Sequence, residues 1–267
     1  MLSKLLKYEI KATGRVFLPF FLSLLLFAGI SKLISSLSPQ QWDTTPAILS
    51  MIIYVIIMAG MFIMTFVVMI QRFYKNLLSE EGYLMFTLPT RPWKHIICKL
   101  LISVMWMAAS VIIAMISILI IAYEKGVITE GIGEIIILFS RLNDRLGASV
   151  SLLTLEILVG VLIGLVSWIL LIYASIAIGH LFSKHKILAS FGAFIVLNTL
   201  SQILFLLLSL TPATITNFFN IHISIDNIAG WHLMELMFAY GIILYGLLST
   251  GYFTITNFIL SKRLNLE

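Results

Sequence analysis

Two side-chain amides lie four residues apart in a long apolar stretch of the chain, at Asn198 and Gln202. Residues with this spacing share one face of a helix, and Ser201 lies on the same face. A buried amide without a hydrogen-bond partner is costly, so these groups need one another, a neighbouring helix or a wet cavity. We interpret them as the lining of a translocation path or an interface between protomers, with hydrogen bonding between helices as the alternative. A second polar stripe has the same interpretations: Thr250, Thr254 and Asn257.

The sequence contains no motif for covalent, metal-dependent or nucleotide chemistry. It lacks His-Glu-x-x-His, Gly-x-Ser-x-Gly with a histidine partner, and the phosphate-binding Gly-x-x-x-x-Gly-Lys-Ser/Thr. His180 and His185 are five residues apart with no third ligand nearby, so we expect interfacial histidines and no metal site. The chain is therefore predicted to be no enzyme and to bind no cofactor by itself.

Composition places these residues in a membrane. Hydrophobic residues make up 60% of the chain and charged residues 11%, with a mean hydropathy of +1.08, which leaves too little polar surface for a water-soluble protein. A spanning helix needs about 20 mostly apolar residues. Six segments qualify: residues 16–37, 47–70, 100–122, 151–178, 188–210 and 235–260. The predicted fold is an all-α membrane protein with six transmembrane helices, a single transmembrane domain over residues 1–267.

Basic residues are distributed unevenly over the segments between these spans. With both termini in the cytoplasm, 13 of the 17 lysine and arginine residues lie on the inner side, as the positive-inside rule requires. The net charge of +5 therefore reflects topology beside an anionic leaflet of membrane lipid, and no nucleic-acid partner is expected. Glu156 is the one acid well inside a predicted span, and we interpret it as a gate or a structural ion pair rather than a proton site.

Residues 1–15 have the pattern of a basic amphipathic helix at the inner membrane interface. Leucine and isoleucine residues occupy one face. The opposite face carries the basic residues Lys4, Lys7, Lys11 and Arg15. Glu9 breaks the apolar face, and it either pairs with a neighbouring inner loop or faces a soluble partner subunit.

The longest inner loop, residues 71–99, interrupts the apolar pattern with EEGYLMFTLPTRPWKHIICKLL at residues 80–101. Negative charge at Glu80 and Glu81 suits the start of a short helix, which Pro89 ends. Pro92 begins the next helix, and Lys99 is expected at headgroup level. The short helix exposes an apolar face, which we interpret as a docking element for a soluble partner, with a helix lying flat on the bilayer as the alternative.

This stretch resembles the inner loop after the second span in permease subunits of type-2 ABC transporters from Firmicutes-like bacteria. The matching residues are Gly82, Tyr83, Leu84, Thr87, Leu88, Pro89 and Lys99. The opening KYEIKATGRVFLPFF, residues 7–21, is similar to the N-terminal helix of the same family. The resemblance implies a coupling helix that sits in a groove of a separate ATPase subunit. Its contact residues would be Glu80, Glu81, Gly82, Tyr83, Leu84, Phe86, Thr87 and Leu88, and a second inner loop would add Lys184 and His185.

The expected function is the membrane-spanning permease subunit of an ATP-driven ABC exporter in the bacterial cytoplasmic membrane. Two ATPase subunits, which would carry the ATP and Mg, and a second like or related protomer are the implied partners. An uncharged path of Asn, Ser and Gln suits an amphipathic or hydrophobic cargo, such as a peptide or a lipid-like molecule. The alternative is an ion-coupled secondary transporter or a channel subunit.

Overall fold

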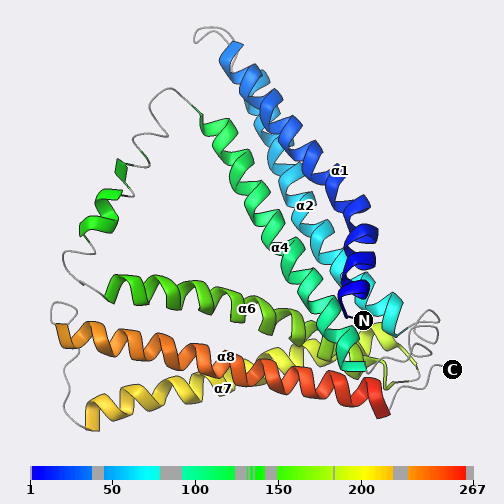
Figure 1. Cartoon of the computed structure of the whole chain (residues 1–267), viewed down its shortest axis with the longest axis vertical. Coiled ribbons are helices and arrows are strands. Elements are labelled where there is room, and N and C mark those ends of the chain that lie inside the picture. Colours follow the sequence, from blue (N-terminus) through cyan, green and yellow to red (C-terminus); the bar gives the residue numbers. More distant parts are fainter. Residues whose placement is uncertain are drawn as a thin grey trace. The chain divides into compact units, whose positions relative to one another are not determined.

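The computed structural model describes residues 2–37, 45–78, 92–123, 131, 133–134, 136–141, 149–182, 184–218 and 228–262. Its long elements are α1 (Leu2–Leu37), α2 (Thr45–Leu77), α4 (Pro92–Ala122), α6 (Ser149–Gly179), α7 (Lys186–Phe218) and α8 (Ile228–Lys262), shown in Figure 1. Each of these six helices contains a stretch long and apolar enough to cross a membrane. The described part of the chain contains no strand. The predicted six-span, all-helical fold is therefore confirmed.

The helices are longer than the apolar segments from which they were predicted. Each has between 31 and 36 residues, whereas about 20 residues cross the hydrocarbon core of a bilayer at about 1.5 Å per residue. Their ends must therefore continue beyond the hydrocarbon. α4 begins at Pro92, as predicted, because proline fits the first helical position, where no backbone N–H is needed.

The N-terminal segment differs in outline from the prediction. Residues 2–37 form one continuous helix, so the structure does not separate an interfacial helix at 1–15 from the first span. The helix continues through Gly14, beside the predicted junction of residues 15 and 16, and through Pro19. A membrane helix tolerates such a proline where neighbouring groups satisfy the freed backbone carbonyl.

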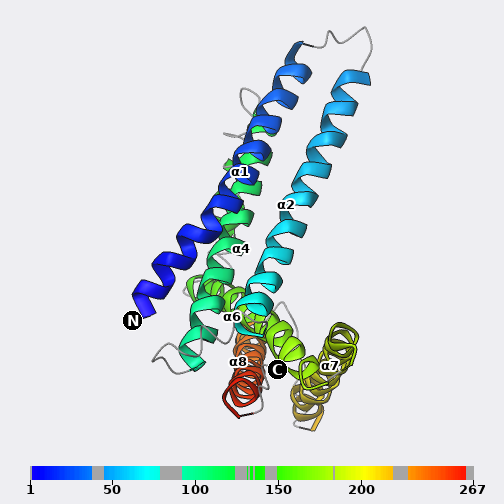
Figure 2. The same cartoon turned by 90° about the vertical axis from the view of Figure 1, so that its right-hand side faces the viewer.

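The chain divides into two compact units, residues 1–73 with 94–135, and residues 74–93 with 136–267. In the first unit, α1, α2 and α4 run alongside one another, as the two views in Figures 1 and 2 show. Their shared core includes Phe17, Leu24, Met61, Ile102 and Trp106. In the second unit, α6 packs along both α7 and α8, whereas α7 and α8 contact each other only sparsely. The expectation of a single transmembrane domain stays a prediction.

The turn between α6 and α7 depends on a close approach of two helices. A Cβ atom added to Gly179 would lie 2.5 Å from the backbone nitrogen and Cα of Ser190, so only glycine fits there. His185, the residue before α7, has a φ of 59°, in the left-handed region. The chain thus reverses direction within a few residues at the end of α6.

Candidate functional site

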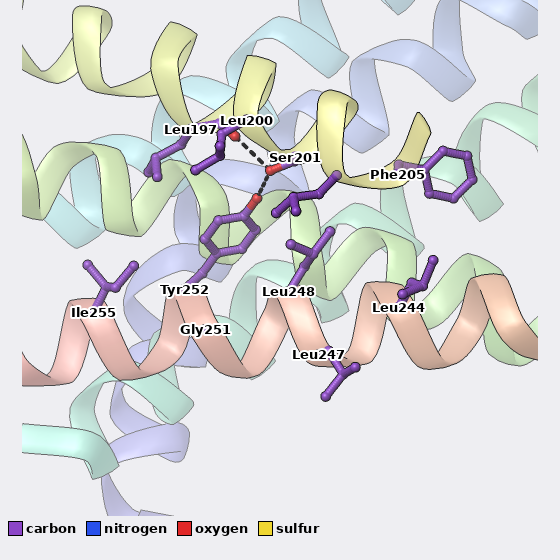
Figure 3. Close-up of a pocket in the computed structure, with 11 residues that line it drawn as sticks. Leu197, Leu200, Ser201, Phe205, Leu244, Leu247, Leu248, Gly251, Tyr252 and Ile255 are labelled. Carbon is purple, nitrogen blue, oxygen red and sulfur yellow. Dashed lines mark hydrogen bonds between the residues drawn. The ribbon is translucent and has the colours of Figure 1, made fainter. Parts of the chain in front are cut away.

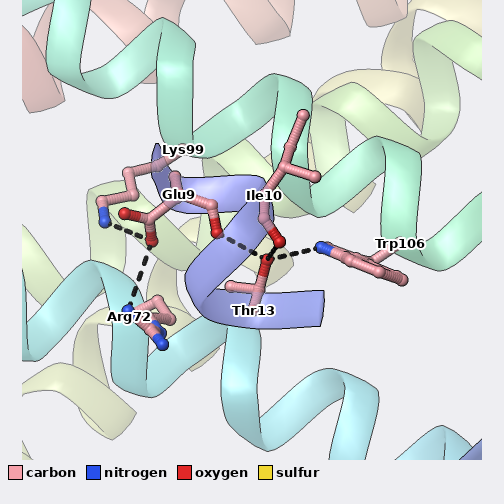
Figure 4. Close-up of polar contacts among 6 residues, drawn as sticks. All are labelled: Glu9, Ile10, Thr13, Arg72, Lys99 and Trp106. Atoms are coloured by element: carbon pink, nitrogen blue, oxygen red, sulfur yellow. Dashed lines mark hydrogen bonds and ion pairs between the residues drawn. The ribbon is translucent and has the colours of Figure 1, made fainter. Parts of the chain in front are cut away.

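A cluster of three charged side chains joins the helices of the first unit (Figure 4). Lys99 on α4 donates a hydrogen bond from Nζ to Oε1 of Glu9 on α1, at 2.7 Å. Arg72 on α2 places Nη1 3.8 Å from the same oxygen. The Lys99 and Glu9 side chains are only 6% and 11% exposed, against 32% for Arg72. We call these three residues the ion cluster.

The ion cluster distinguishes between the two interpretations of Glu9. The structure shows this carboxylate paired inside the chain, rather than facing outward for a partner subunit. Lys99 is buried against Glu9, and its expected position at headgroup level stays a prediction. A buried charge is stable only with a close opposite charge, and Glu9 supplies it.

The ion cluster lies near the two helix ends that flank the predicted inner loop. α2 ends at Leu77 and α4 begins at Pro92, so Arg72 and Lys99 lie within two turns of the helix ends that flank residues 78–91. Glu9 connects both of them to α1. The ion cluster thus joins α1 to the ends of α2 and α4 that flank this segment.

A line of neutral polar side chains continues from the ion cluster along α4. Trp106 donates from Nε1 to Thr13 Oγ1 at 2.8 Å, Ser110 Oγ lies 3.0 Å from Thr65 Oγ1, and Ser117 Oγ lies 2.8 Å from Tyr54 Oη. The α4 residues follow one another at steps of four or seven residues, so they share one face of the helix. We call this face, together with Lys99, the α4 seam.

The α4 seam is filled by packing as well as by hydrogen bonds. The Trp106 ring stacks on Phe17 with the ring centroids 4.5 Å apart, and Ser110 and Ser117 are fully buried. The hydroxyls of Thr13, Ser110 and Ser117 each also donate to a backbone carbonyl of their own helix. These polar groups find their partners within the first unit, which favours a role in helix assembly.

The second unit contains a cavity of about 380 Å³ among three helices. The amides of Asn198 and Gln202 and the hydroxyl-bearing Ser201 reach it from α7, and Ser167 and Tyr252 from α6 and α8. The described residues that line this cavity include no charged side chain. The structure thus brings the predicted polar stripe of α7 to one cavity, which we call the polar chamber.

Two of these helices, α7 and α8, also form an apolar groove of about 330 Å³ next to the polar chamber (Figure 3). Leucine residues of α7 and α8 form most of its walls, together with Gly251 and Ile255. Ser201 and Tyr252 line both the groove and the polar chamber, and their hydroxyls are hydrogen-bonded. Ser201 Oγ donates to the Leu197 carbonyl at 2.6 Å, so the Tyr252 hydroxyl is the donor in the bond between the two side chains.

The polar stripe predicted on α8 does not reach either cavity. Thr250 and Thr254 are exposed, and each hydroxyl bonds to a carbonyl of its own helix at 2.7 Å, while Asn257 is half-buried. The polar α8 side chains at the polar chamber are instead Tyr245 and Tyr252, which sequence reasoning missed because aromatic residues are common in any span. The assignment of the α8 stripe to a protomer interface stays a prediction.

The short turn after α6 presents the second predicted contact region. Lys184 and His185 are exposed, and Phe182 and Ile187 beside them are 55% and 81% exposed. His180 packs its ring edge against Tyr74, with the centroids 5.4 Å apart. Burial, followed by the nearby charge of Lys186, lowers the pKa of His180 from its usual 6.5, so this histidine is neutral at pH 7.

Some of the remaining predicted residues lie outside the described part of the chain. These are the residues of the predicted coupling segment: Glu80, Glu81, Gly82, Tyr83, Leu84, Phe86, Thr87 and Leu88. Those of the N-terminal basic face are all described and exposed: Lys4, Lys7, Lys11 and Arg15. Within the described residues, no three side chains of metal-ligating type come together. Comparison with protein-family models, with curated proteins and with solved structures gives no match for this chain.

Proposed function

We propose that this chain is the membrane-spanning permease subunit of an ATP-driven ABC exporter. The observation that carries the proposal is the polar chamber, where uncharged amides and hydroxyls meet inside helices that are otherwise apolar. A bilayer offers no hydrogen-bond partner for such groups, and the polar part of a cargo that binds or passes there would supply one. The cargo it suits is amphipathic or hydrophobic, a peptide or a lipid-like molecule.

Energy for transport would come from a separate subunit. The sequence has no phosphate-binding loop of its own, and residues 80–101 resemble the coupling segment of type-2 ABC permeases. The ion cluster supports this role, because it links the two helices that flank the segment to α1. Two ATPase subunits would bind ATP and Mg, and a second protomer would complete the path in a bacterial cytoplasmic membrane.

The test removes the apolar face of the coupling segment. In the variant Tyr83→Asp with Leu84→Asp, the tagged chain should still insert, but an ATPase subunit should no longer co-purify with it in mild detergent. The matched control is Ile136→Asp with Phe139→Asp, two exposed apolar residues on the predicted outer side, which should retain the ATPase. Equal ATPase recovery with both variants would contradict the proposed coupling.

Glu156 favours a second candidate, an ion-coupled secondary transporter. Its Oε2 atom is buried and has no hydrogen-bond partner among the described residues, and an acid in a span is the usual carrier of a transported proton. Glu156→Gln separates the two candidates. The transport of an ATP-driven exporter should not depend on the pH gradient in either the parent chain or this variant, whereas a proton-coupled transporter should show this dependence in the parent chain and lose it in the variant.

A further inference from the structure

The crevice between α7 and α8 has two halves of opposite polarity. Because these helices contact each other only sparsely, the space between them stays open on both sides. The polar chamber lies on the side of α6, and the apolar groove lies on the other side, lined by α7 and α8 alone. Only the hydrogen-bonded pair Ser201 and Tyr252, with Phe205 and Leu248, is shared by the two halves.

The polar chamber selects against charged groups. Its described lining offers two amides, several hydroxyls and the indole of Trp168, but no lysine, arginine or carboxylate. An ionic group placed there would lose its hydration without gaining a counter-charge. Hydroxyl and amide groups, in contrast, find both donors and acceptors on Asn198 and Gln202.

The apolar groove offers almost only hydrocarbon. Apart from Ser201 and Tyr252, whose hydroxyls bond to each other, its described lining consists of aliphatic and aromatic side chains and Gly251. Figure 3 shows these leucine side chains on both sides of the tyrosine ring. A hydrocarbon chain is therefore the matching occupant of this half.

We propose that the crevice binds an uncharged amphiphile, with its hydroxyl- or amide-bearing head in the polar chamber and its hydrocarbon chain in the apolar groove. The hydrogen bond from Tyr252 to Ser201 closes the passage between the halves, and it opens when the head takes its place as the partner of the tyrosine. This inference rests on the proposed function, because it names the cargo class of the same site. Binding itself requires no ATPase and is measured on the purified full-length chain.

The probe is a monoacylglycerol with a photoreactive diazirine in its chain, added to the protein in phosphatidylcholine vesicles. Gly251→Leu fills the groove, since a Cβ at Gly251 meets no atom within 4 Å and points into free space. Gly246→Leu is the matched control, because it is equally open on the same helix but lines neither half. Gly164→Leu fills the polar chamber in the same way.

The expected result is labelling of α7 and α8 peptides that contain groove residues. Labelling should fall roughly tenfold in Gly251→Leu and in Gly164→Leu, the effect of about 1.4 kcal/mol of lost affinity, and stay unchanged in Gly246→Leu. An unlabelled monoacylglycerol should displace the probe. A fatty acid and an alkyltrimethylammonium of the same chain length should displace it at least tenfold less well, because the chamber holds no counter-charge.

Three results would overturn the inference. The first is equal labelling of all three glycine variants, which would mean contact with bulk lipid only. The second is equal competition by the charged amphiphiles, or a co-purifying lipid that the probe does not displace. The third is a disulfide between two chains that carry Leu247→Cys with no labelling of the groove, which would assign it to a second protomer. Loss of the ATPase partner with intact labelling would contradict only the proposed function.

Discussion

Replacing Lys99 by methionine tests whether the ion cluster holds the first unit together. The substitution keeps the length of the side chain and removes the charge that lies 2.7 Å from Glu9. The Glu9 carboxylate, only 11% exposed, would then retain Arg72 alone, at 3.8 Å. Removing one partner of a buried pair typically costs about 3–5 kcal/mol. For a chain of this size, this corresponds to a fall of roughly 6–20 °C in melting temperature.

Two companion variants show whether burial sets this cost. Arg72→Gln should cost less than about 1 kcal/mol, because the arginine is partly exposed and its contact is long. The double variant Glu9→Leu with Lys99→Met should recover most of the loss, since no buried charge stays unpaired.

All variants would be heated in the same detergent and followed by far-ultraviolet circular dichroism. The reasoning is refuted if Arg72→Gln loses as much stability as Lys99→Met, or if the double variant is no more stable than Lys99→Met.

Three further predictions concern the end of α6 and its turn. Gly179→Ala should lower the unfolding free energy by more than about 1 kcal/mol, because the new methyl group meets the Ser190 backbone, whereas Gly192→Ala, with open space around it, should be neutral or slightly stabilising. The lowered pKa of His180 means that the unfolded chain binds its proton more readily, so stability should fall as the pH drops below about 6.5 and be less pH-dependent in His180→Phe. Lys184→Cys in a cysteine-free background should react with an impermeant maleimide only in inverted vesicles, and labelling in intact cells would contradict the predicted orientation.

The sequence was sufficient to predict the six spans and the polar residues with which α7 lines the polar chamber. Apolar length alone predicts six helices, and the spacing of Asn198, Ser201 and Gln202 places three polar groups on one face of α7. Helical spacing does not say toward which neighbour a face points. Thr250 and Thr254 have equally regular spacing, but a threonine hydroxyl can bond to its own helix, so neither needs to point into the protein.

Contacts between segments that are distant in the sequence could not be predicted from the local residue pattern. Glu9 and Lys99 are 90 residues apart, and nothing near either residue indicates the other. The interpretation that Glu9 pairs with an inner loop was one of two alternatives, and only the structure supplies the partner. Trp106 and Thr13 are 93 residues apart, and a tryptophan in a span is as compatible with an interfacial anchor as with a donor to a buried hydroxyl.

The α4 seam has a consequence for how the helices of the first unit align. In a bilayer, apolar side chains gain little by exchanging lipid contacts for one another, and each interhelical hydrogen bond contributes only about 0.6 kcal/mol on average. Such bonds hold helices together weakly, but they are specific for position. If α4 slid by one turn, about 5.4 Å, Trp106, Ser110 and Ser117 would all lose their partners at once, as would Lys99. The α4 seam therefore fixes the axial register of α4 against α1 and α2. The surrounding apolar surfaces alone would be compatible with many registers.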